Sequence, residues 1–201
     1  MIYNIVGLIM NFLVSLIGYL CSIPARAKGM KFGKKSYIGW GYDFLFSSMK
    51  GVIIDDDVLI GRDAWIQTIN NNDTNRDGPI ISIGKSSRIG RSVTISCKKK
   101  ITIGEKCLIS YNVSILDHDH YCYELRSPVE SGLTDGEEII IRDDCFIGAH
   151  SFILKGVQLG KHCVVGANCV VTKSFPDYSL IAGNPAKLVK NIKCQTSEQF
   201  S

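Results

Sequence analysis

Residues 139–171 read IIIRDDCFIGAHSFILKGVQLGKHCVVGANCVV, and this stretch repeats with a period of six residues. One aliphatic residue opens each hexad: Ile141, Ile147, Ile153, Leu159, Val165 and Val171. A small or compact residue follows each of the first five after four places: Cys145, Ser151, Val157, Cys163 and Cys169. A helical face does not recur every six residues. The period instead predicts short strands joined by tight turns, with two side chains of each hexad directed inward.

The same period recurs upstream with changes of phase, in stretches that begin at Phe32, Ile54, Ile83 and Ile103. Three hexads make one turn of a three-sided coil, and such coils stack at the strand spacing of about 4.8 Å. Each coil buries its aliphatic side chains only against its neighbours, so the ends of the stack need caps. We therefore predict an all-β fold: a parallel β-helix of about six triangular coils, with an N-terminal helix and a short C-terminal tail.

We expect three parts in the chain of 201 residues: an apolar N-terminal helix over residues 1–30, a β-helix domain over residues 31–190 and a C-terminal tail over residues 191–201. Two segments interrupt the repeat, at residues 69–80 and 121–138, and we expect both to leave the coils as loops. Loops held on a rigid scaffold commonly carry function, so these two segments are the first places to look for a site.

The composition excludes several classes of protein. Hydrophobic residues make up 45% and charged residues 21% of the chain, which is too apolar for a disordered protein. The net charge of +4 comes without a dense block of Lys and Arg, so nucleic acid is not an expected partner.

The eight cysteines form neither a CxxC pair nor a zinc-finger spacing. Four of them fall at the small inward position of the hexad: Cys107, Cys145, Cys163 and Cys169. These four are expected to serve as small hydrophobic core residues, not as metal ligands or nucleophiles. Reduced thiols also suit a cytosolic protein better than a disulfide-bonded secreted one.

Residues 2–25 carry no charge, and small or polar residues recur there at steps of three or four, which places them on one helical stripe. Pro24 is expected to end this helix, and five basic residues follow between positions 26 and 35. Three interpretations stay open. The helix lies in the membrane surface or packs on a neighbouring subunit, it spans the bilayer, or it is a signal peptide.

The stretch from Ile139 to Lys190, IIIRDDCFIGAHSFILKGVQLGKHCVVGANCVVTKSFPDYSLIAGNPAKLVK, resembles the hexapeptide-repeat acyltransferases. The maltose, galactoside and polysaccharide O-acetyltransferases of that family share this pattern throughout, and the resemblance extends upstream to about residue 32. It implies that the coils wind left-handed, against the usual crossover rule. It also implies a homotrimer in which acetyl-CoA lies between adjacent prisms.

The family's general base is a histidine that stands just before the large loop. The matching stretch here is SILDHDH, residues 114–120, and it assigns that role to His118. The chemistry agrees, because an acceptor hydroxyl attacks a thioester poorly unless a base poised near neutrality takes its proton. The imidazole needs a partner to orient it, and Asp117, Asp119 and a main-chain carbonyl are all candidates.

Contacts to the two substrates follow from the same resemblance. Acceptor contacts are expected just after the base, although residues there are as often merely exposed: His120, Tyr121, Tyr123, Glu124 and Arg126. Contacts to acetyl-CoA are implied for eight residues of the C-terminal half: Phe146, Ala149, Gly166, Ala167, Thr172, Lys173, Lys187 and Lys190. Where the galactoside and maltose enzymes carry acidic and amide acceptor ligands, this chain has SCKKK at residues 96–100. Three exposed lysines there would suit an anionic acceptor.

The resemblance implies an acetyl-CoA-dependent O-acetyltransferase for a sugar hydroxyl of a cell-surface or exopolysaccharide precursor. It would work in the cytoplasm, with membrane-surface contact through residues 1–25. An N-acetyltransferase for an amino-sugar nucleotide and a non-catalytic β-helix scaffold are the alternatives. A metal enzyme on this fold would need three converging histidines, and the spacing of His118, His120 and His150 does not provide them, so no metal is expected.

Overall fold

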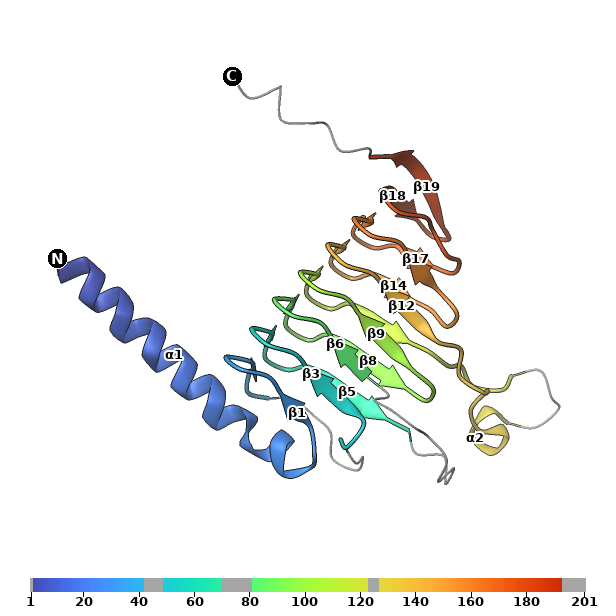
Figure 1. Ribbon diagram of the computed structural model, residues 1–201. Helices are drawn as coiled ribbons and strands as arrows, with labels where there is room; N and C mark the ends of the chain where they lie inside the picture. Colours follow the sequence, from blue (N-terminus) through green and yellow to red (C-terminus); the bar gives the residue numbers. More distant parts are fainter. Residues whose placement is uncertain (1, 42–48, 70–80, 123–126, 193–201) are drawn as a thin grey trace, which may run out of the picture.

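A computed structural model of the chain describes residues 2–41, 49–69, 81–122 and 127–192, with the side chains of the N-terminal helix from residue 13 onward. Its short strands form three sheets, one on each side of a triangular column (Figure 1). The first sheet contains, in hydrogen-bonded order, β1 (Lys31–Phe32), β3 (Val52–Ile54), β6 (Ile81–Ile83), β9 (Ile101–Ile103), β12 (Ile139–Ile141) and β15 (Gln158–Leu159).

The second sheet contains β2 (Tyr37–Ile38), β4 (Leu59–Ile60), β7 (Arg88–Ile89), β10 (Leu108–Ile109), β13 (Phe146–Ile147), β16 (Val164–Val165), β18 (Ser179–Gly183) and β19 (Ala186–Asn191). The third sheet contains β5 (Trp65–Thr68), β8 (Thr94–Cys97), β11 (Ser114–Leu116), β14 (Phe152–Ile153) and β17 (Val170–Val171). Neighbouring strands pair in parallel, except that β19 turns back antiparallel on β18. The predicted left-handed β-helix of about six coils is confirmed.

The hexad positions occupy the places that the sequence predicts. The six aliphatic residues from Ile141 to Val171 are completely buried, and their counterparts in the earlier coils are at most 4% exposed from Ile38 to Ile115. Cys107, Cys145, Cys163 and Cys169 are buried as well, and no disulfide links the cysteines of the described ranges. Phe44, which continues the six-residue period that begins at Phe32, lies outside the described residues.

The chain turns at each corner of the column between the aliphatic residue and the small inward residue that follows it by four places. The residue just before it, three places after the aliphatic, takes a left-handed backbone conformation, with φ between 52° and 60° at Asp57, Lys106, Asn112, Asp144 and His150. Asn and Asp adopt this conformation at lower cost than most residues. His150 and His162 therefore belong to the corner turns, as their spacing suggests.

The N-terminal helix α1 (Ile2–Ala27) continues three residues beyond Pro24, so the expectation that Pro24 ends it was wrong. The end lies instead at Gly29, where φ is +98°. The Gly29 amide donates to the Arg26 carbonyl and the Met30 amide to the Ala25 carbonyl. This pair of bonds is a Schellman motif, which satisfies the last helical carbonyls and needs a glycine in the left-handed region.

The two ends of the column are covered by different devices. At the first coil α1 packs on the edge strand β2, where the Ser22 hydroxyl accepts a hydrogen bond from the Ile38 amide at 3.0 Å. At the last coil the β18–β19 hairpin extends the second sheet. The expected C-terminal cap, residues 191–201, lies almost wholly outside the described residues. Within the described part of the chain, no helix has the length and hydropathy of a membrane span.

Candidate functional site

The predicted base stands at one corner of the column, where the chain leaves the third sheet and departs into the long loop. Leu116, the last residue of β11, pairs with Ser96 of β8 in the preceding coil. Asp117 and His118 follow directly, and the chain rejoins the first sheet at Ile139, which pairs with Ile101. The loop carries the short helix α2 (Pro128–Ser131) and projects from the side of the column (Figure 1).

The Asp117 carboxylate turns inward onto the backbone of the preceding coil. The amide of Lys98 donates to its Oδ1 at 2.7 Å, and the amides of Lys99 and Lys100 donate to its Oδ2 at 2.7 and 3.0 Å. The Cys97 thiol donates to the same Oδ2 at 3.3 Å. The side chain is completely buried. Successive amides that converge on one carboxylate make an anion-binding concavity of backbone donors, so this corner holds a negative charge without any contact to solvent.

The charge state of Asp117 follows from two opposed effects. Burial raises the pKa of the carboxyl, because the charged form loses its hydration. Hydrogen bonds from His118, from the amides of Lys98 and Lys99, and from Cys97 oppose this, and together they hold the pKa below its ordinary value. Asp117 is therefore ionised at neutral pH.

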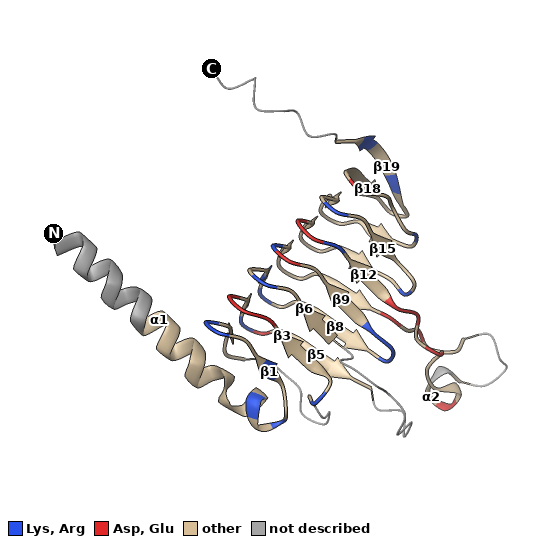
Figure 2. Cartoon of the chain, in the orientation of Figure 1, with Lys and Arg blue, Asp and Glu red and all other residues tan. Residues whose placement is uncertain are grey.

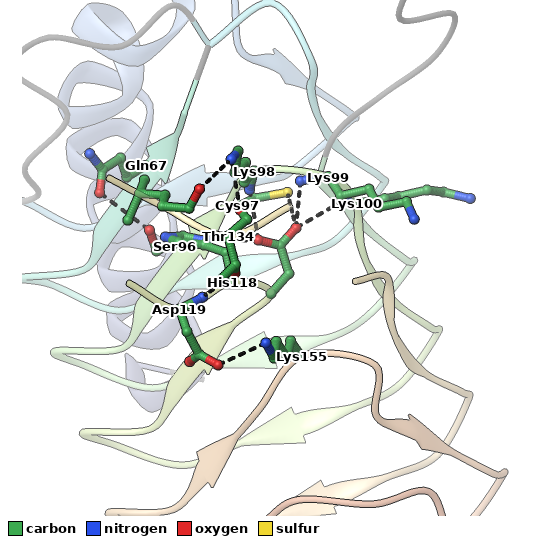
Figure 3. Close-up of polar contacts among 12 residues, drawn as sticks. Gln67, Ser96, Cys97, Lys98, Lys99, Lys100, His118, Asp119, Thr134 and Lys155 are labelled. Atoms are coloured by element: carbon green, nitrogen blue, oxygen red, sulfur yellow. Dashed lines mark hydrogen bonds and ion pairs between the residues drawn. The ribbon is translucent and has the colours of Figure 1, made fainter. Parts of the chain in front are cut away.

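The His118 ring is fixed by this carboxylate. Its Nδ1 lies 2.9 Å from Asp117 Oδ1, and its side chain is only 9% exposed (Figure 3). An ionised carboxylate can only accept, so Nδ1 carries the proton of that bond, and in the neutral ring Nε2 holds the lone pair. The pair can therefore receive a proton at Nε2, and the imidazolium that results is stabilised by the adjacent charge.

Asp119, the other candidate for orienting the imidazole, is directed elsewhere. Its carboxylate forms an ion pair with Lys155 Nζ at 3.0 Å, and its side chain is 54% exposed (Figure 3). Its amide donates to the Thr134 hydroxyl and its carbonyl accepts from the Thr134 amide. Of the two aspartates, the structure brings Asp117 to the ring, and it uses Asp119 to attach the returning limb of the loop.

An anionic acceptor would need the lysines at residues 98–100 to be exposed, and Lys98 is buried. Its side chain is only 8% exposed, and Nζ donates to the carbonyls of Leu133 and Thr134 at 3.1 and 2.7 Å. Lys100 forms an ion pair with Glu138 at 2.8 Å. Lys98 therefore links the loop to the coil whose amides bind Asp117. Because its ammonium group is buried against main-chain carbonyls, it is not accessible to an acceptor.

The candidate acceptor residues lie at the start of the loop. His120 and Tyr121 are exposed; His120 bridges to Leu133, and the Tyr121 amide donates to the Gly132 carbonyl. Tyr123, Glu124 and Arg126 lie outside the described residues. The two described residues thus flank the His118 corner on the surface of the column.

The residues expected to bind acetyl-CoA separate into groups by position. Ala149, Gly166 and Ala167 lie at the corner between the second and third sheets, where Gly148 stacks against the Ala167 backbone. Phe146 lies on the second sheet beside them, 37% exposed. Four polar residues are exposed further along, after β17 and on β19: Thr172, Lys173, Lys187 and Lys190.

The pairing register places Lys173, one of the residues expected to bind acetyl-CoA, at the same corner of the column as His118. Ser114 pairs with Phe152, and Phe152 pairs with Val170. Three residues beyond these partners come Asp117 and Lys173, so Lys173 lies at the His118 corner two coils away. The corner that holds Ala149 and Ala167 is a different one.

Sequence reasoning missed the support of the site. Cys97, the 98–100 amides and Lys155 all contact it, but residues 96–100 were considered only as counterparts of acceptor ligands, and Lys155 was given no role. The register was the available signal: Cys97 and Lys155 occupy positions one coil before and one coil after the base. Among the described residues, no group of three His, Cys, Asp or Glu side chains is arranged to hold a metal ion.

Comparison with known proteins gives one family and several relatives. Residues 138–173 match the family model described as the hexapeptide repeat of succinyl-transferase. The galactoside O-acetyltransferase of Escherichia coli (strain K12) is 30% identical over 141 residues, which cover 66% of this chain and 63% of that protein. The 2,3,4,5-tetrahydropyridine-2,6-dicarboxylate N-acetyltransferase of Staphylococcus aureus (strain JH9) is 46% identical over 52 residues, 26% of this chain and 22% of that protein.

Among solved structures, AntD, an N-acyltransferase from Bacillus cereus in complex with dTDP and 3-hydroxybutyryl-CoA, superposes with a TM-score of 0.69. The identity is 19%, and the match covers 86% of this chain and 88% of AntD. The chain spans less than two thirds of the length of the curated relatives that it matches. The chain thus carries the hexapeptide repeat at residues 138–173 and is similar over 141 residues to the galactoside O-acetyltransferase.

Proposed function

We propose that the protein is an acetyl-CoA-dependent O-acetyltransferase that modifies a sugar hydroxyl of a cell-surface or exopolysaccharide precursor, with His118 as general base. The observation that carries the proposal is the 2.9 Å contact between His118 Nδ1 and a completely buried, ionised Asp117. Burial alone would favour the neutral form of this carboxyl group, and three amides and a thiol hold it in the charged form instead. A histidine with only a structural role would not require a charged partner of this kind.

The proposed proton path runs through Nε2 of His118. The acceptor hydroxyl gives its proton to Nε2 of His118 while its oxygen attacks the thioester carbonyl carbon of acetyl-CoA. The tetrahedral intermediate collapses with cleavage of the carbon–sulfur bond, and the departing thiolate takes the proton back from the imidazolium. Asp117 stays ionised throughout and offsets the positive charge that His118 carries between the two transfers.

Several exposed residues fit an acyl-CoA. Phe146 offers an apolar wall, and Ala149 and Ala167 leave room for a narrow arm to approach the backbone. Lys173 and Lys187 suit phosphate as point charges. In one prism these residues lie at two corners, and a homotrimer would bring one corner of a subunit against another corner of its neighbour. We therefore include the trimer in the proposal, with acetyl-CoA bound between subunits.

The acceptor is expected to meet the protein at the loop beside His118, through His120 and Tyr121 and through Tyr123, Glu124 and Arg126. Lys98 and Lys100 are engaged within the chain, so the support for an anionic acceptor is reduced to Lys99, which is exposed. The proposal places the reaction on the cytoplasmic side, where lipid-linked glycan precursors meet acetyl-CoA.

The test is mass spectrometry of sugars, sugar nucleotides and lipid-linked glycans after incubation with acetyl-CoA. The wild-type protein and the His118→Ala variant are compared, with His150→Ala as the matched control because His150 is an exposed corner histidine. We expect one acceptor to gain an acetyl group, and His118→Ala to lower the rate by about a hundredfold or more. Full activity of His118→Ala would refute the assignment of the base.

The same assay separates the alternatives. Acetylation of an amino-sugar nucleotide, and of no hydroxyl acceptor, would favour the N-acetyltransferase, which the Staphylococcus relative makes worth testing. Failure of the protein to bind acetyl-CoA in calorimetry would favour the non-catalytic scaffold. Detection by mass avoids thiol-reactive dyes, which would also label the eight cysteines of the chain.

A further inference from the structure

The described part of α1 has two faces of different character. Gly18, Ser22 and Ala25 are buried against the first coil, and a Cβ on Gly18 would lie 2.3 Å from the Tyr37 ring. The helix is therefore seated closely and in one orientation. The other side carries large apolar side chains at steps of three and four that are between 42% and 58% exposed: Leu13, Leu16, Ile17, Leu20 and Ile23.

A pocket of about 420 Å³ flanks this apolar face, between α1 and the first coil. Its lining is aromatic, cationic and hydroxylic, with no acidic residue: Ser15, Tyr19, Arg26, Phe32, Gly33, Lys34, Lys35, Ser36 and Tyr37. Arg26 lies over the rings of Tyr19 and Phe32, with its guanidinium carbon 5.2 and 4.5 Å from their centroids. The rings hold the guanidinium at the pocket.

Arg26 has capacity for an anion. Its Nε is buried and has no hydrogen-bond partner among the described residues, and a terminal nitrogen of the guanidinium donates to the Ser36 carbonyl at a long 3.4 Å. A buried donor left without an acceptor is costly, so Nε of Arg26 is available to an acceptor that a bound ligand supplies. The nearby acids are engaged otherwise: Asp57 accepts from Arg88, and Asp56 accepts from the Lys34 amide.

The charge pattern continues around the pocket. Lys34 and Lys35 form the exposed corner beyond β1, and Figure 2 shows basic residues at the end of α1 and beside β1. An exposed apolar helix face bordered by cations is the arrangement of a helix that lies in the headgroup layer of an anionic membrane. Long basic side chains there reach phosphates while their stems cover apolar surface.

We propose that α1 docks this protein on an anionic lipid bilayer, with Leu16, Ile17, Leu20 and Ile23 in the acyl-chain boundary and a lipid phosphate in the pocket of Arg26, Lys34 and Lys35. Because Ser22 and Gly18 fix the helix to the first coil, the bilayer would meet one end of the column. The inference does not depend on acetyl transfer and stands on α1 and the first coil alone.

The test is co-sedimentation of the full chain with vesicles of phosphatidylcholine, with and without phosphatidylglycerol. We expect binding to the anionic vesicles that weakens as salt is raised, because screening reduces the attraction of the lysines. Ile17→Ser/Leu20→Ser/Ile23→Ser should lower the binding by about tenfold or more. The matched control is Leu108→Ser/Val129→Ser, which removes exposed aliphatic side chains far along the chain and should bind as the wild type does.

A second variant keeps the test informative if the helix variant is poorly folded. Lys34→Gln/Lys35→Asn suits the local backbone, since Asn tolerates the left-handed conformation of Lys35. Because Arg26 remains, this variant should weaken the binding and reduce its dependence on salt. Equal binding to both kinds of vesicle would overturn the proposal. Absence of binding to the anionic vesicles would also overturn it. In that case, light scattering tests whether the apolar face of α1 serves self-association instead. Calorimetry tests whether the pocket binds inorganic phosphate instead of a lipid.

Discussion

Asp117 is the residue on which the candidate site depends, because it joins two coils and orients the His118 ring. In Asp117→Asn the side-chain NH2 group must meet either a backbone amide or Nδ1–H, so at least one donor faces another donor. We expect a loss of about 1–3 kcal/mol in the free energy of unfolding. Activity should fall by about a hundredfold or more, since the ring loses the partner that fixes its tautomer.

The control for this prediction is Asp119→Asn, which alters an exposed ion pair with Lys155. Exposed pairs of this kind contribute about 0–1 kcal/mol, so both stability and rate should stay close to those of the wild type. Urea unfolding at fixed protein concentration and the acetylation assay measure the two effects. Equal losses in the two variants would contradict the special position of Asp117.

The lowered pKa of Asp117 gives a pH dependence with a definite sign. Its pKa in the folded protein lies below the ordinary value of 3.8, so the unfolded chain binds the proton more readily. The stabilisation is fully present above about pH 3.8 and is lost as the pH falls through the lower folded value. The stability difference between wild type and Asp117→Asn should therefore shrink in acid. A difference that stays constant from pH 5 down to the acid limit of folding would be the contrary result.

At the scale of elements, α1 shows what a sequence pattern can and cannot specify. Of the predicted stripe of small and polar residues, Gly18 and Ser22 are buried together with Ala25, whereas Ser15 is exposed. The end of the helix was misplaced, because Pro24 lacks a donor but does not prevent the next turn from closing. The end depends on Gly29, whose left-handed conformation allows the Schellman bonds to the Ala25 and Arg26 carbonyls.

Ser22 should be the polar residue of α1 that matters for stability. Its hydroxyl donates to the Gly18 carbonyl at 2.8 Å and accepts from the Ile38 amide at the edge of β2. Ser22→Ala leaves that amide buried without a partner, and we expect a cost of about 1–3 kcal/mol. Ser15→Ala, on the exposed side of the same helix, should change stability by less than about 0.5 kcal/mol. Thermal unfolding of both variants decides whether the helix caps the column or merely lies on it.

At the scale of the whole molecule, stacking follows a rule that the hexads reveal only in part. The small inward residue of one coil donates to a carbonyl of the next: Ser87 to Gly104, Cys107 to Arg142, Cys145 to Gly160 and Ser151 to Gly166. Serine and cysteine are interchangeable in this role, and Val58 and Val113 fill the same place by packing alone. The sequence predicted that these residues are small and buried; their hydrogen bonds between coils emerged only from the structure.

This stacking predicts how a core cysteine responds to change. Cys145→Ser keeps a donor for the Gly160 carbonyl and should cost about 1 kcal/mol or less. Cys145→Leu adds volume to a filled column and should cost about 1–3 kcal/mol. Urea midpoints of the two variants test the order. If the serine variant proved the weaker of the two, the thiol would be needed for more than filling space and donating one bond.

The repeat predicted the column, and the resemblance to the hexapeptide-repeat acyltransferases predicted His118 as the base. Neither could predict the partners of the His118 corner. Lys98 and Lys155 contact the loop because they lie on the coils before and after it. A six-residue period does not specify the direction of a side chain on an exposed corner. The acceptor contacts are the least predictable, because Tyr123, Glu124 and Arg126 lie in a segment that departs from the repeat altogether.

The fastening by Lys98 has a consequence for how such a protein can diversify. The ammonium binds main-chain carbonyls of Leu133 and Thr134, and every amino acid supplies the same carbonyl. The strand that follows recovers its place through Ile139 and Ile101, whatever precedes it. A segment of foreign sequence could therefore be grafted between positions 121 and 132 without disturbing the imidazole. In the proposed function, the loop that meets the acceptor could therefore be exchanged while the corner with His118 and Asp117 is kept.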